Sequence, residues 1–386
     1  MISKIMVVDD EPDLEVLITQ KYRKKIRNNE LEFVFARDGE DALQKLENNG
    51  EIDIVLTDIN MPKMDGLTLL ANIHEKYPLL KSVIVSAYGD MANIRTAFNK
   101  GAFDFLTKPI DFQDLEITID KTLHEASILK QAEKDRGRLI TLQNELEIAR
   151  EIQAAMIPQK FPPFPERKEI EIFAHMIAAK KVGGDFYDFF FIDENHFGFA
   201  IGDVSGKGVP AALFMAVSRT LLKSTAFREK AAKDVLSSVN KLLRDEKTNA
   251  MFVTLFYGIL DTRTGEIEYS NAGHNPPLVV KRGGKIVPLD LTEDFVLGAI
   301  SYSEYHSKKI KIQPGESILL HTDGVTEAMN HEYEQYSDER LHARLNSQKQ
   351  LSPTELVHSI LEDVNAFSAG AEQSDDITVM ALKYNG

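Results

Sequence analysis

Two groups of acidic residues in this 386-residue sequence have the side chains that binding a divalent cation and a phosphoryl group would require. The first group is Asp9, Asp10 and Asp58 with Lys108, and the second is Asp185, Asp203, Asp323 and Asp375. Because apolar runs typical of strands lie next to these residues, carboxylates that are distant in sequence would meet in space. The chain would then receive phosphate at one end and remove it at the other.

The elements that must position the first group alternate regularly over residues 1–122. Short apolar runs at 5–8, 33–36, 53–56, 81–85 and 103–106 are separated by segments with helical spacing. This rhythm predicts an α/β fold with a doubly wound, five-stranded parallel sheet, whose binding site lies beyond the carboxyl ends of its strands. Asp9, Asp10, Asp58, Ser86 and Lys108 all fall at those ends.

The chemistry expected at this edge is phosphoryl transfer to Asp58. Adjacent carboxylates repel one another unless a cation neutralises them, and Mg²⁺ is the expected ion. Asp58 would act as the nucleophile, with Lys108 drawing charge from the incoming group and the Ser86 hydroxyl bonding to the new phosphate. Phe105 would rotate inward when Ser86 moves. The alternative, that these acids only cap helices, does not explain why Asp58, Ser86 and Lys108 are in register.

These residues resemble the receiver domain of bacterial response regulators. The motifs are Val7–Glu11, Thr57–Gly66, Ser86-Ala87 and Thr107–Pro109. The resemblance implies a metal role for Asp9, Asp10 and the Asn60 carbonyl, phosphorylation of Asp58 by a sensor histidine kinase, and switching by Ser86 and Phe105.

Residues 123–160 are interpreted as a helical linker, formed by one long helix or by two helices broken near Gly137. A narrow apolar stripe with heptad-like steps comprises Leu139, Leu142, Leu146, Ala149, Gln153 and Met156. Such a stripe favours a coiled coil and a homodimer. The alternative is that the stripe packs on the following domain of its own chain. Pro158 and the segment 161–165 then stop the helix.

Residues 161–386 shift to strand-like runs at 197–201, 252–256, 267–269, 278–280, 317–320 and 377–380, with helical patterns at 210–224, 234–245 and 353–366. This order predicts an α+β domain of antiparallel sheets packed face to face and flanked by helices.

The second group of aspartates lies beside these runs. Oxygen-only ligands favour Mg²⁺ or Mn²⁺, and two such ions could activate a shared water for in-line attack at phosphorus. Two other motifs fail around Ser205. The Walker spacing is broken at positions 201 and 208, and Asp203 and Lys207 replace the glycines of a serine-hydrolase elbow.

This half resembles the sporulation-type branch of the metal-dependent (PPM) protein serine phosphatases. The motifs are 147–153, Val182–Asp188, Gly202–Gly208, Asn271–Pro277, Thr322–Gly324 and Asp375–Thr378. The resemblance implies two Mn²⁺ or Mg²⁺ ions bridged by Asp203. Asp323 and Asp375 would hold the first ion, and Asp185 and the Val204 carbonyl would complete the shells.

Four residues depart from the pattern of eukaryotic relatives or leave a role open. Ser205 stands near the place of a histidine that can protonate the leaving group, so the general acid is unassigned. Lys180 or Lys181 could replace a phosphate-binding arginine, but a solvated pair is the simpler interpretation. His274 lies in a turn rich in Pro and Asn, where we expect a structural role.

Composition excludes several function classes. A formal net charge of −15 argues against sequence-independent binding of nucleic acid. No apolar run approaches the ~20 residues of a membrane span, and the start of the sequence does not resemble a signal peptide. Because cysteine is absent, disulfides and cysteine zinc sites are excluded, and we expect a cytoplasmic protein.

The sequence therefore predicts a response regulator that is phosphorylated on Asp58 and whose output is a protein serine/threonine phosphatase. The resemblance implies a phosphorylated anti-sigma factor antagonist as substrate. The alternative is a catalytically inactive, phosphatase-like adaptor, which we would expect to lack several of the four aspartates.

Overall fold

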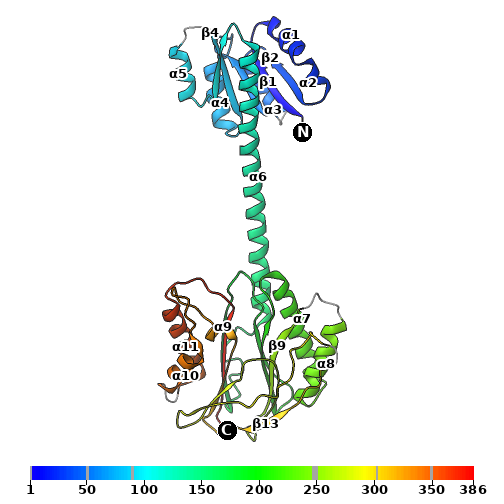
Figure 1. The fold of residues 1–386 in the computed structure, drawn as a ribbon, viewed down its shortest axis with the longest axis vertical. Coiled ribbons are helices and arrows are strands. Elements are labelled where there is room, and N and C mark those ends of the chain that lie inside the picture. The colour runs from blue at the N-terminus through cyan, green and yellow to red at the C-terminus, as the bar shows by residue number, and fades with distance from the viewer. Residues whose placement is uncertain (1, 49–51, 88–90, 246–250, 301–302, 348–350) are drawn as a thin grey trace. The chain divides into compact units, whose positions relative to one another are not determined.

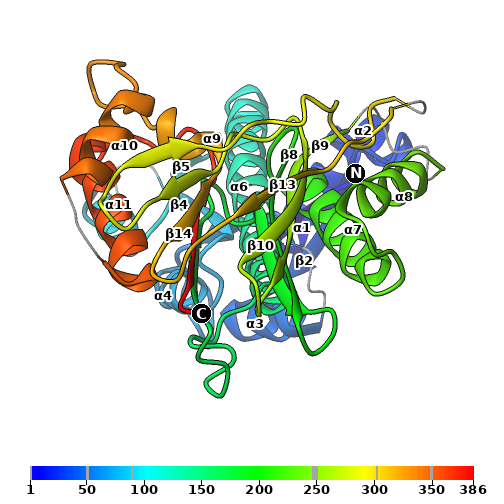
Figure 2. The same ribbon diagram turned by 90° about the horizontal axis from the view of Figure 1, so that it is seen from below.

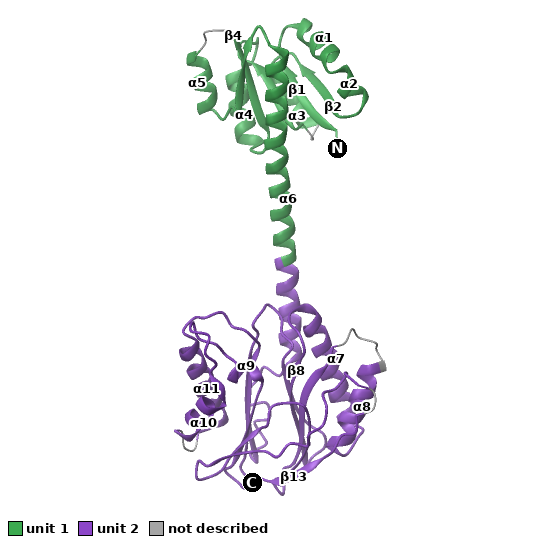
Figure 3. Ribbon diagram, viewed as in Figure 1, with its two compact units in different colours: residues 1–142 green, residues 143–386 purple. Residues whose placement is uncertain are grey.

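The computed structural model describes residues 2–48, 52–87, 91–245, 251–300, 303–347 and 351–386 (Figure 1). The chain divides into two compact units, Met1–Leu142 and Gln143–Gly386 (Figure 3). This division falls inside the predicted linker, and the predicted boundaries at 122 and 160 stay predictions.

The first unit is a parallel sheet with helices on both faces. In the described part of this unit the sheet has five strands in the order β2-β1-β3-β4-β5. The strands are β1 (Ser3–Val8), β2 (Leu31–Ala36), β3 (Ile54–Asp58), β4 (Lys81–Ala87) and β5 (Asp104–Lys108). The helices are α1 (Pro12–Lys21), α2 (Arg23–Arg27), α3 (Gly39–Asn48), α4 (Gly66–Lys76), α5 (Met91–Asn99) and the start of α6 (Phe112–Met156). The predicted doubly wound fold is confirmed.

Alternation along the strands explains why both faces are covered. Along β1, Ile5 and Val7 point into one apolar cluster with Leu115 of α6, whereas Met6 and Val8 point into another with the apolar residues of α3 and α4. Successive side chains of a strand point to opposite faces, so a continuous apolar run requires cover on both.

Helix α6 runs without interruption through Gly137 to Met156. An added Cβ at Gly137 would meet nothing within 4 Å, and the site is open. Of the two interpretations of the linker, a single helix is therefore correct.

The second unit is a sandwich of two sheets. In its described residues each sheet has five strands, in the orders β13-β10-β9-β8-β7 and β12-β11-β14-β15-β6. The first sheet comprises β7 (Phe186–Phe191), β8 (His196–Val204), β9 (Val253–Asp261), β10 (Glu266–Ala272) and β13 (Lys308–Lys311). The second comprises β6 (Ile170–Ile177), β11 (Leu278–Val280), β12 (Ile286–Pro288), β14 (Ser317–His321) and β15 (Ile377–Tyr384).

Helices cover the outer faces of this sandwich. Within the second unit of Figure 2, α7 (Val209–Ala226) and α8 (Ala232–Asp245) lie on one side, and α10 (Ser337–Asn346) and α11 (Pro353–Ser368) lie on the other. The short α9 (Asp323–Thr326) follows β14. Between the sheets, Phe199, Phe256 and Leu382 belong to one buried apolar cluster. The predicted layers are confirmed.

Candidate functional site

The first group of acids meets at one edge of the parallel sheet of the first unit. Asp9 follows β1, Asp58 ends β3, and each of Asp9, Asp10 and Asp58 offers a carboxylate oxygen within 4.8 Å of the others. Asp9 and Asp58 are buried and Asp10 is exposed. Three carboxylates this close, with one open to solvent, fit a hard divalent cation that keeps several waters.

Lys108, the last residue of β5, brings a positive charge to the same edge. Its Nζ lies 2.7 Å from Asp58 Oδ2 and 3.0 Å from Asp9 Oδ2. Burial lowers the pKa of Lys108, but hydrogen bonds to Asp58 and Asp9 outweigh burial and raise it above its ordinary value. Burial raises the pKa of Asp9. A cavity of about 340 Å³ adjoins Asp9 and Asp10.

The predicted switch residues lie on neighbouring strands. Ser86 is buried on β4, opposite Thr107 of β5, and Phe105 is half-buried on β5. Phe105 contacts Phe98 edge to face, with ring centroids 6.1 Å apart. Asn60 is exposed, two residues after Asp58. The switching and metal roles of these residues stay predictions.

The second group of acids lies where four strands begin or end, two from each sheet. Asp185 immediately precedes β7, Asp203 lies near the end of β8, Asp323 begins α9 after β14, and Asp375 precedes β15. Charge repulsion links Asp203 with both Asp323 and Asp375. The sandwich therefore brings together residues up to 190 positions apart.

Burial and repulsion between charges raise the pKa values of Asp185, Asp203 and Asp323. Burial, then the charge on Asp323, raises the pKa of Asp203 to about 7. Burial, followed by the charges on Asp203 and Asp376, raises the pKa of Asp185 well above its ordinary value. Burial also raises the pKa of Asp323. Cations placed among these groups would relieve the repulsion.

The second group is spread more widely than the first. Over the described ranges, only the receiver trio brings three carboxylate oxygens within 4.8 Å of one another. A pair of ions about 4 Å apart divides its ligands between two centres.

Two glycines let the backbone pack tightly here. A Cβ on Gly184 would lie 2.8 Å from the carbonyl oxygen of Val204, the predicted carbonyl ligand. A Cβ on Gly324 would lie 1.9 Å from the Asp376 carbonyl oxygen. Only glycine fits at either position.

Sequence reasoning missed the side chains that orient Asp185. The hydroxyls of Thr322 and Thr378 donate to Asp185 Oδ2 at 2.7 and 2.6 Å. Asp376 accepts from the backbone N–H of Gly184 at 2.6 Å. Thr322 and Asp376 each stand beside a predicted ligand, and Thr378 ends the quoted motif that contains Asp375, which was the available signal.

Other polar residues have structural partners. Ser205 Oγ accepts from the Phe252 N–H at 3.0 Å. His274 is buried and its Nδ1 lies 2.9 Å from Thr254 Oγ1. Lys181 pairs with Glu147 at 3.2 Å. Lys207 pairs with Asp375 at 2.9 Å and donates to the Ser374 carbonyl. Lys207 is thus a cation beside a predicted ligand.

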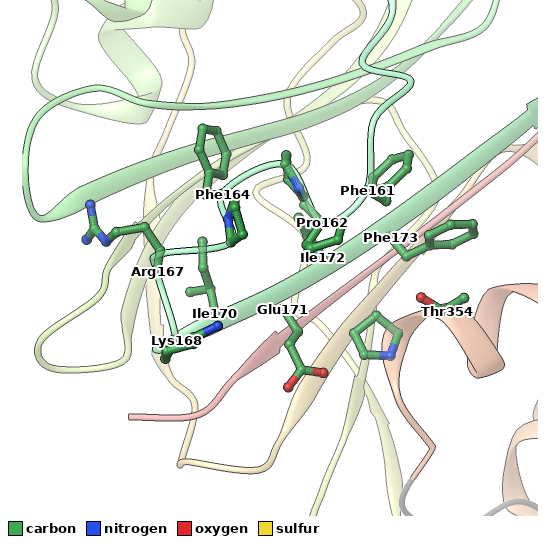
Figure 4. A pocket seen from close by; sticks show the side chains of 13 residues that line it. Phe161, Pro162, Phe164, Arg167, Lys168, Ile170, Glu171, Ile172, Phe173 and Thr354 are labelled. Atoms are coloured by element: carbon green, nitrogen blue, oxygen red, sulfur yellow. The ribbon is translucent and has the colours of Figure 1, made fainter.

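An apolar cavity of about 430 Å³ lies elsewhere in the second unit (Figure 4). Phe161, Phe164 and Phe173 contribute to its lining, and the described residues around it include none of the four aspartates. Phe161 contacts Phe173 with centroids 4.7 Å apart. The segment that stops the helix therefore packs on β6.

Comparison with known proteins assigns both units. The model of the response regulator receiver domain matches residues 5–120, and the model of Stage II sporulation protein E (SpoIIE) matches residues 193–385. Similar proteins include Protein IcfG of a Synechocystis strain, 32% identical over 268 residues, and Phosphoserine phosphatase RsbU of Bacillus subtilis, 27% identical over 216 residues. These matches cover 62% and 56% of this chain, but only 42% of IcfG and 63% of RsbU.

Solved structures show a shared fold. The SiaA-PP2C domain of Pseudomonas aeruginosa matches with a TM-score of 0.57 at 19% identity, over 64% of this chain and 98% of that one. Among the described helices, none has the combined length and apolar character of a bilayer span. By its sequence match and its fold, the chain belongs to the SpoIIE family and carries a response regulator receiver domain ahead of the family's conserved region.

Proposed function

We propose that this chain is a response regulator whose receiver accepts a phosphoryl group on Asp58 and whose second unit is a metal-dependent protein serine/threonine phosphatase. The observation that carries the proposal is the acidic cluster of Asp185, Asp203, Asp323 and Asp375, in which Asp185 is buried, the other three are half-buried, and burial and repulsion raise the pKa of Asp203 to about 7. Such a cluster is unfavourable unless cations are bound.

The four aspartates of the cluster would together bind two Mn²⁺ or Mg²⁺ ions. Asp203 would lie between the ions, Asp323 and Asp375 would hold one of them, and Asp185 with the Val204 carbonyl would complete the shells. Divalent cations bound there would supply Lewis-acid activation of the attacking water. Thr322 and Thr378 orient Asp185. Lys207 places a positive charge beside Asp375, where an anionic substrate would approach.

The proposed substrate is phosphoserine or phosphothreonine on a partner protein. The phosphoserine phosphatases RsbU and RsbP of Bacillus subtilis, both relatives by sequence, support this class. A phosphorylated anti-sigma factor antagonist is the specific candidate, and its dephosphorylation would free it to bind an anti-sigma factor. This candidate rests on the family resemblance.

The proposed input is a sensor histidine kinase that phosphorylates Asp58. Asp9, Asp10, Asp58 and the Asn60 carbonyl would hold Mg²⁺, and Lys108, 2.7 Å from Asp58, would balance the added charge. Ser86 and Phe105 would then change the receiver surface.

The proposed assembly is a homodimer formed through α6. Leu139 and Leu142 support it, with side chains 56% and 48% exposed. The second half of the stripe behaves differently, because Gln153 is buried against its own domain. The proposed pairing is therefore assigned to the first half of the stripe, and packing on the same chain is assigned to its second half.

Asp203→Asn tests the phosphatase assignment. We expect Mn²⁺-dependent release of phosphate from a phosphoserine protein to fall at least about a thousandfold, equivalent to about 4 kcal/mol of transition-state stabilisation. Asp193→Asn, at an exposed turn, is the matched control. Full activity of Asp203→Asn would show that the metal assignment is wrong, and a wild-type chain without turnover would favour the adaptor.

Asp58→Asn tests the input. Acetyl phosphate should change the phosphatase rate of the wild-type chain, and the ratio of rates with and without it should become one in the variant. Equal responses of both proteins would remove Asp58 from the signalling path.

A further inference from the structure

Strand β6 forms a free edge of the second unit. It is the last strand in the order β12-β11-β14-β15-β6, and within the described residues it pairs with β15 alone. At the end of this ladder the Asn385 N–H donates to the Glu169 carbonyl at 2.8 Å. Because bonding to a neighbouring antiparallel strand alternates from residue to residue, the backbone N–H and C=O groups of Ile170, Ile172 and Ala174 point away from β15.

These outward backbone groups have no hydrogen-bond partner among the residues that the structure describes. An unpaired edge presents a row of donors and acceptors with which another extended chain can pair. Strand β6 has eight residues and contains no proline, so nothing in its own sequence interrupts such pairing. The edge is therefore suited to the addition of a strand from another molecule.

Two cavities lie along this edge, and both have Phe161 and Phe173 in their linings. The first, of about 430 Å³, is lined by residues 170–173 of β6 (Figure 4). The second, of about 440 Å³, is lined by residues 174–176. We call these two cavities together the β6 groove. Aromatic rings in the groove can receive an apolar side chain of an added strand, and such pockets give strand addition its specificity.

The β6 groove is rich in basic residues, although the chain as a whole is acidic. The charged residues of its described lining are Arg150, Arg167, Lys168, Lys180, Lys181 and Glu171. Glu147 pairs with Arg150 and Lys181, and Glu169 pairs with Arg167. Five basic residues thus face three acidic ones, whereas the whole sequence has a net charge of −15. The groove therefore favours an acidic ligand.

Lys168 and Lys180 are the basic residues best placed to meet such a ligand. Both are exposed, and neither forms an ion pair with another described residue. Lys168 stands two residues before β6 begins, and Lys180 stands three residues after it ends. An added strand with acidic residues toward both ends would meet a positive charge at each.

We propose that the β6 groove is a docking site for an extended, acidic segment of a partner protein, which pairs with β6 as an added strand. The proposal does not depend on the phosphatase assignment, since none of the four proposed metal ligands is among the described residues of the groove. A second copy of this chain is a poorer occupant. Two-fold pairing of β6 with itself would bring Lys168 of one copy toward Lys180 of the other, and like charges repel.

A random library of peptides as long as β6, selected on the full-length chain, tests the proposal. We expect the selected peptides to be acidic toward both ends and apolar between them. One selected peptide is then labelled with fluorescein and its affinity is measured by anisotropy. Two versions of it carry N-methyl groups on alternate residues, one version on each edge of the strand. The version methylated on the edge that faces β6 should bind at least about tenfold more weakly, because it loses the ladder hydrogen bonds, and the other should bind normally.

Lys168→Glu combined with Lys180→Glu should weaken binding of the unmethylated peptide at least about tenfold. The matched control is Lys233→Glu with Lys311→Glu, which changes the net charge equally at two exposed lysines outside the groove and should leave affinity unchanged. Thr354→Phe, at an exposed residue that lines the first cavity, should also weaken binding by filling it. Circular dichroism shows whether each variant is folded.

A selection that enriches no acidic peptides would overturn the proposal. Equal affinities of the wild-type chain and the folded Lys168 and Lys180 double variant would do so too, as would normal binding of both methylated peptides. A wild-type dimer that Thr354→Phe converts into a monomer would place a second copy in the groove instead. None of these results would bear on the proposed phosphatase activity.

Discussion

Asp185 illustrates how single side chains are prepared for metal binding. It is 1% exposed, and two threonine hydroxyls donate to the same oxygen, Oδ2. These hydrogen bonds favour the ionised carboxylate, whereas burial and the charge on Asp203 disfavour it. The two threonines thus fix the orientation of the Asp185 carboxylate, and a bound cation would stabilise its ionised form.

His274 gives a residue-scale prediction for pH. Burial lowers its pKa to about 3. The unfolded chain takes up a proton near pH 6.5 and the folded chain does so only near pH 3, so the stabilisation is complete above pH 6.5 and is lost as the pH falls. Between pH 6.5 and 4, the wild-type free energy of unfolding should fall by about 3 kcal/mol more than that of His274→Gln.

Urea unfolding followed by circular dichroism at several pH values measures this difference. His331→Gln, at an exposed position, should follow the wild-type curve. Parallel curves for wild type and His274→Gln would mean that His274 takes up its proton normally in the folded chain.

The sequence revealed the aspartates but not most of their supporting contacts. Carboxylates beside apolar runs have a recognisable chemistry, and the motifs around Asp58 and Asp203 are specific in combination. The hydrogen bond between Asp376 and Gly184 joins residues 192 positions apart. Gln153 looked like one member of an apolar stripe, but its Nε2 donates to the Gly183 carbonyl, a partner that nothing in its spacing identifies.

At the scale of elements, a buried ion pair joins α7 to β7. Asp188 on β7 is fully buried, and its Oδ2 lies 2.8 Å from the Arg219 guanidinium on α7. Burial raises the pKa of Asp188, and the charge on Arg219 opposes this rise. Because α7 begins six residues after Asp203, this pair helps to fix a helix that starts beside the metal-binding acids.

Asp188→Ala should therefore lower the free energy of unfolding by about 3 kcal/mol, because Arg219 would keep a largely buried charge without its partner. Asp193→Ala is the control, since Asp193 forms an exposed pair with His196 and should cost less than about 1 kcal/mol. Urea unfolding measures both. Equal stabilities would mean that the Asp188 pair contributes nothing measurable.

Helices and strands were predicted correctly where the hydrophobic periodicity of the sequence was clear. The five receiver strands alternate with helices, and all were recognised. In the second unit, β6, β7, β12, β13, α9 and α10 were missed. β7 is almost entirely buried because α7 covers the face opposite the sandwich core, so it shows no alternation. β13 is mostly lysine, so its sequence alone does not indicate a strand. Its backbone pairs with β10, and this pairing makes it part of the sheet.

For the molecule as a whole, α6 carries the proposed dimer contact. Leu139→Glu combined with Leu142→Glu should convert a dimer into a monomer, because like charges would replace an apolar seam. Light scattering on the full-length chain measures this change. Asn144→Glu, at an exposed position outside the stripe, should leave the dimer intact. A wild-type monomer would contradict the pairing of these helices.

The central claim is that Asp185, Asp203, Asp323 and Asp375 hold a pair of cations. Anomalous diffraction from crystals soaked in Mn²⁺ tests it most directly. We predict two peaks among these side chains, with Asp203 in contact with both. Well-ordered carboxylates with no peak between them would contradict the metal centre and the phosphatase activity proposed from it.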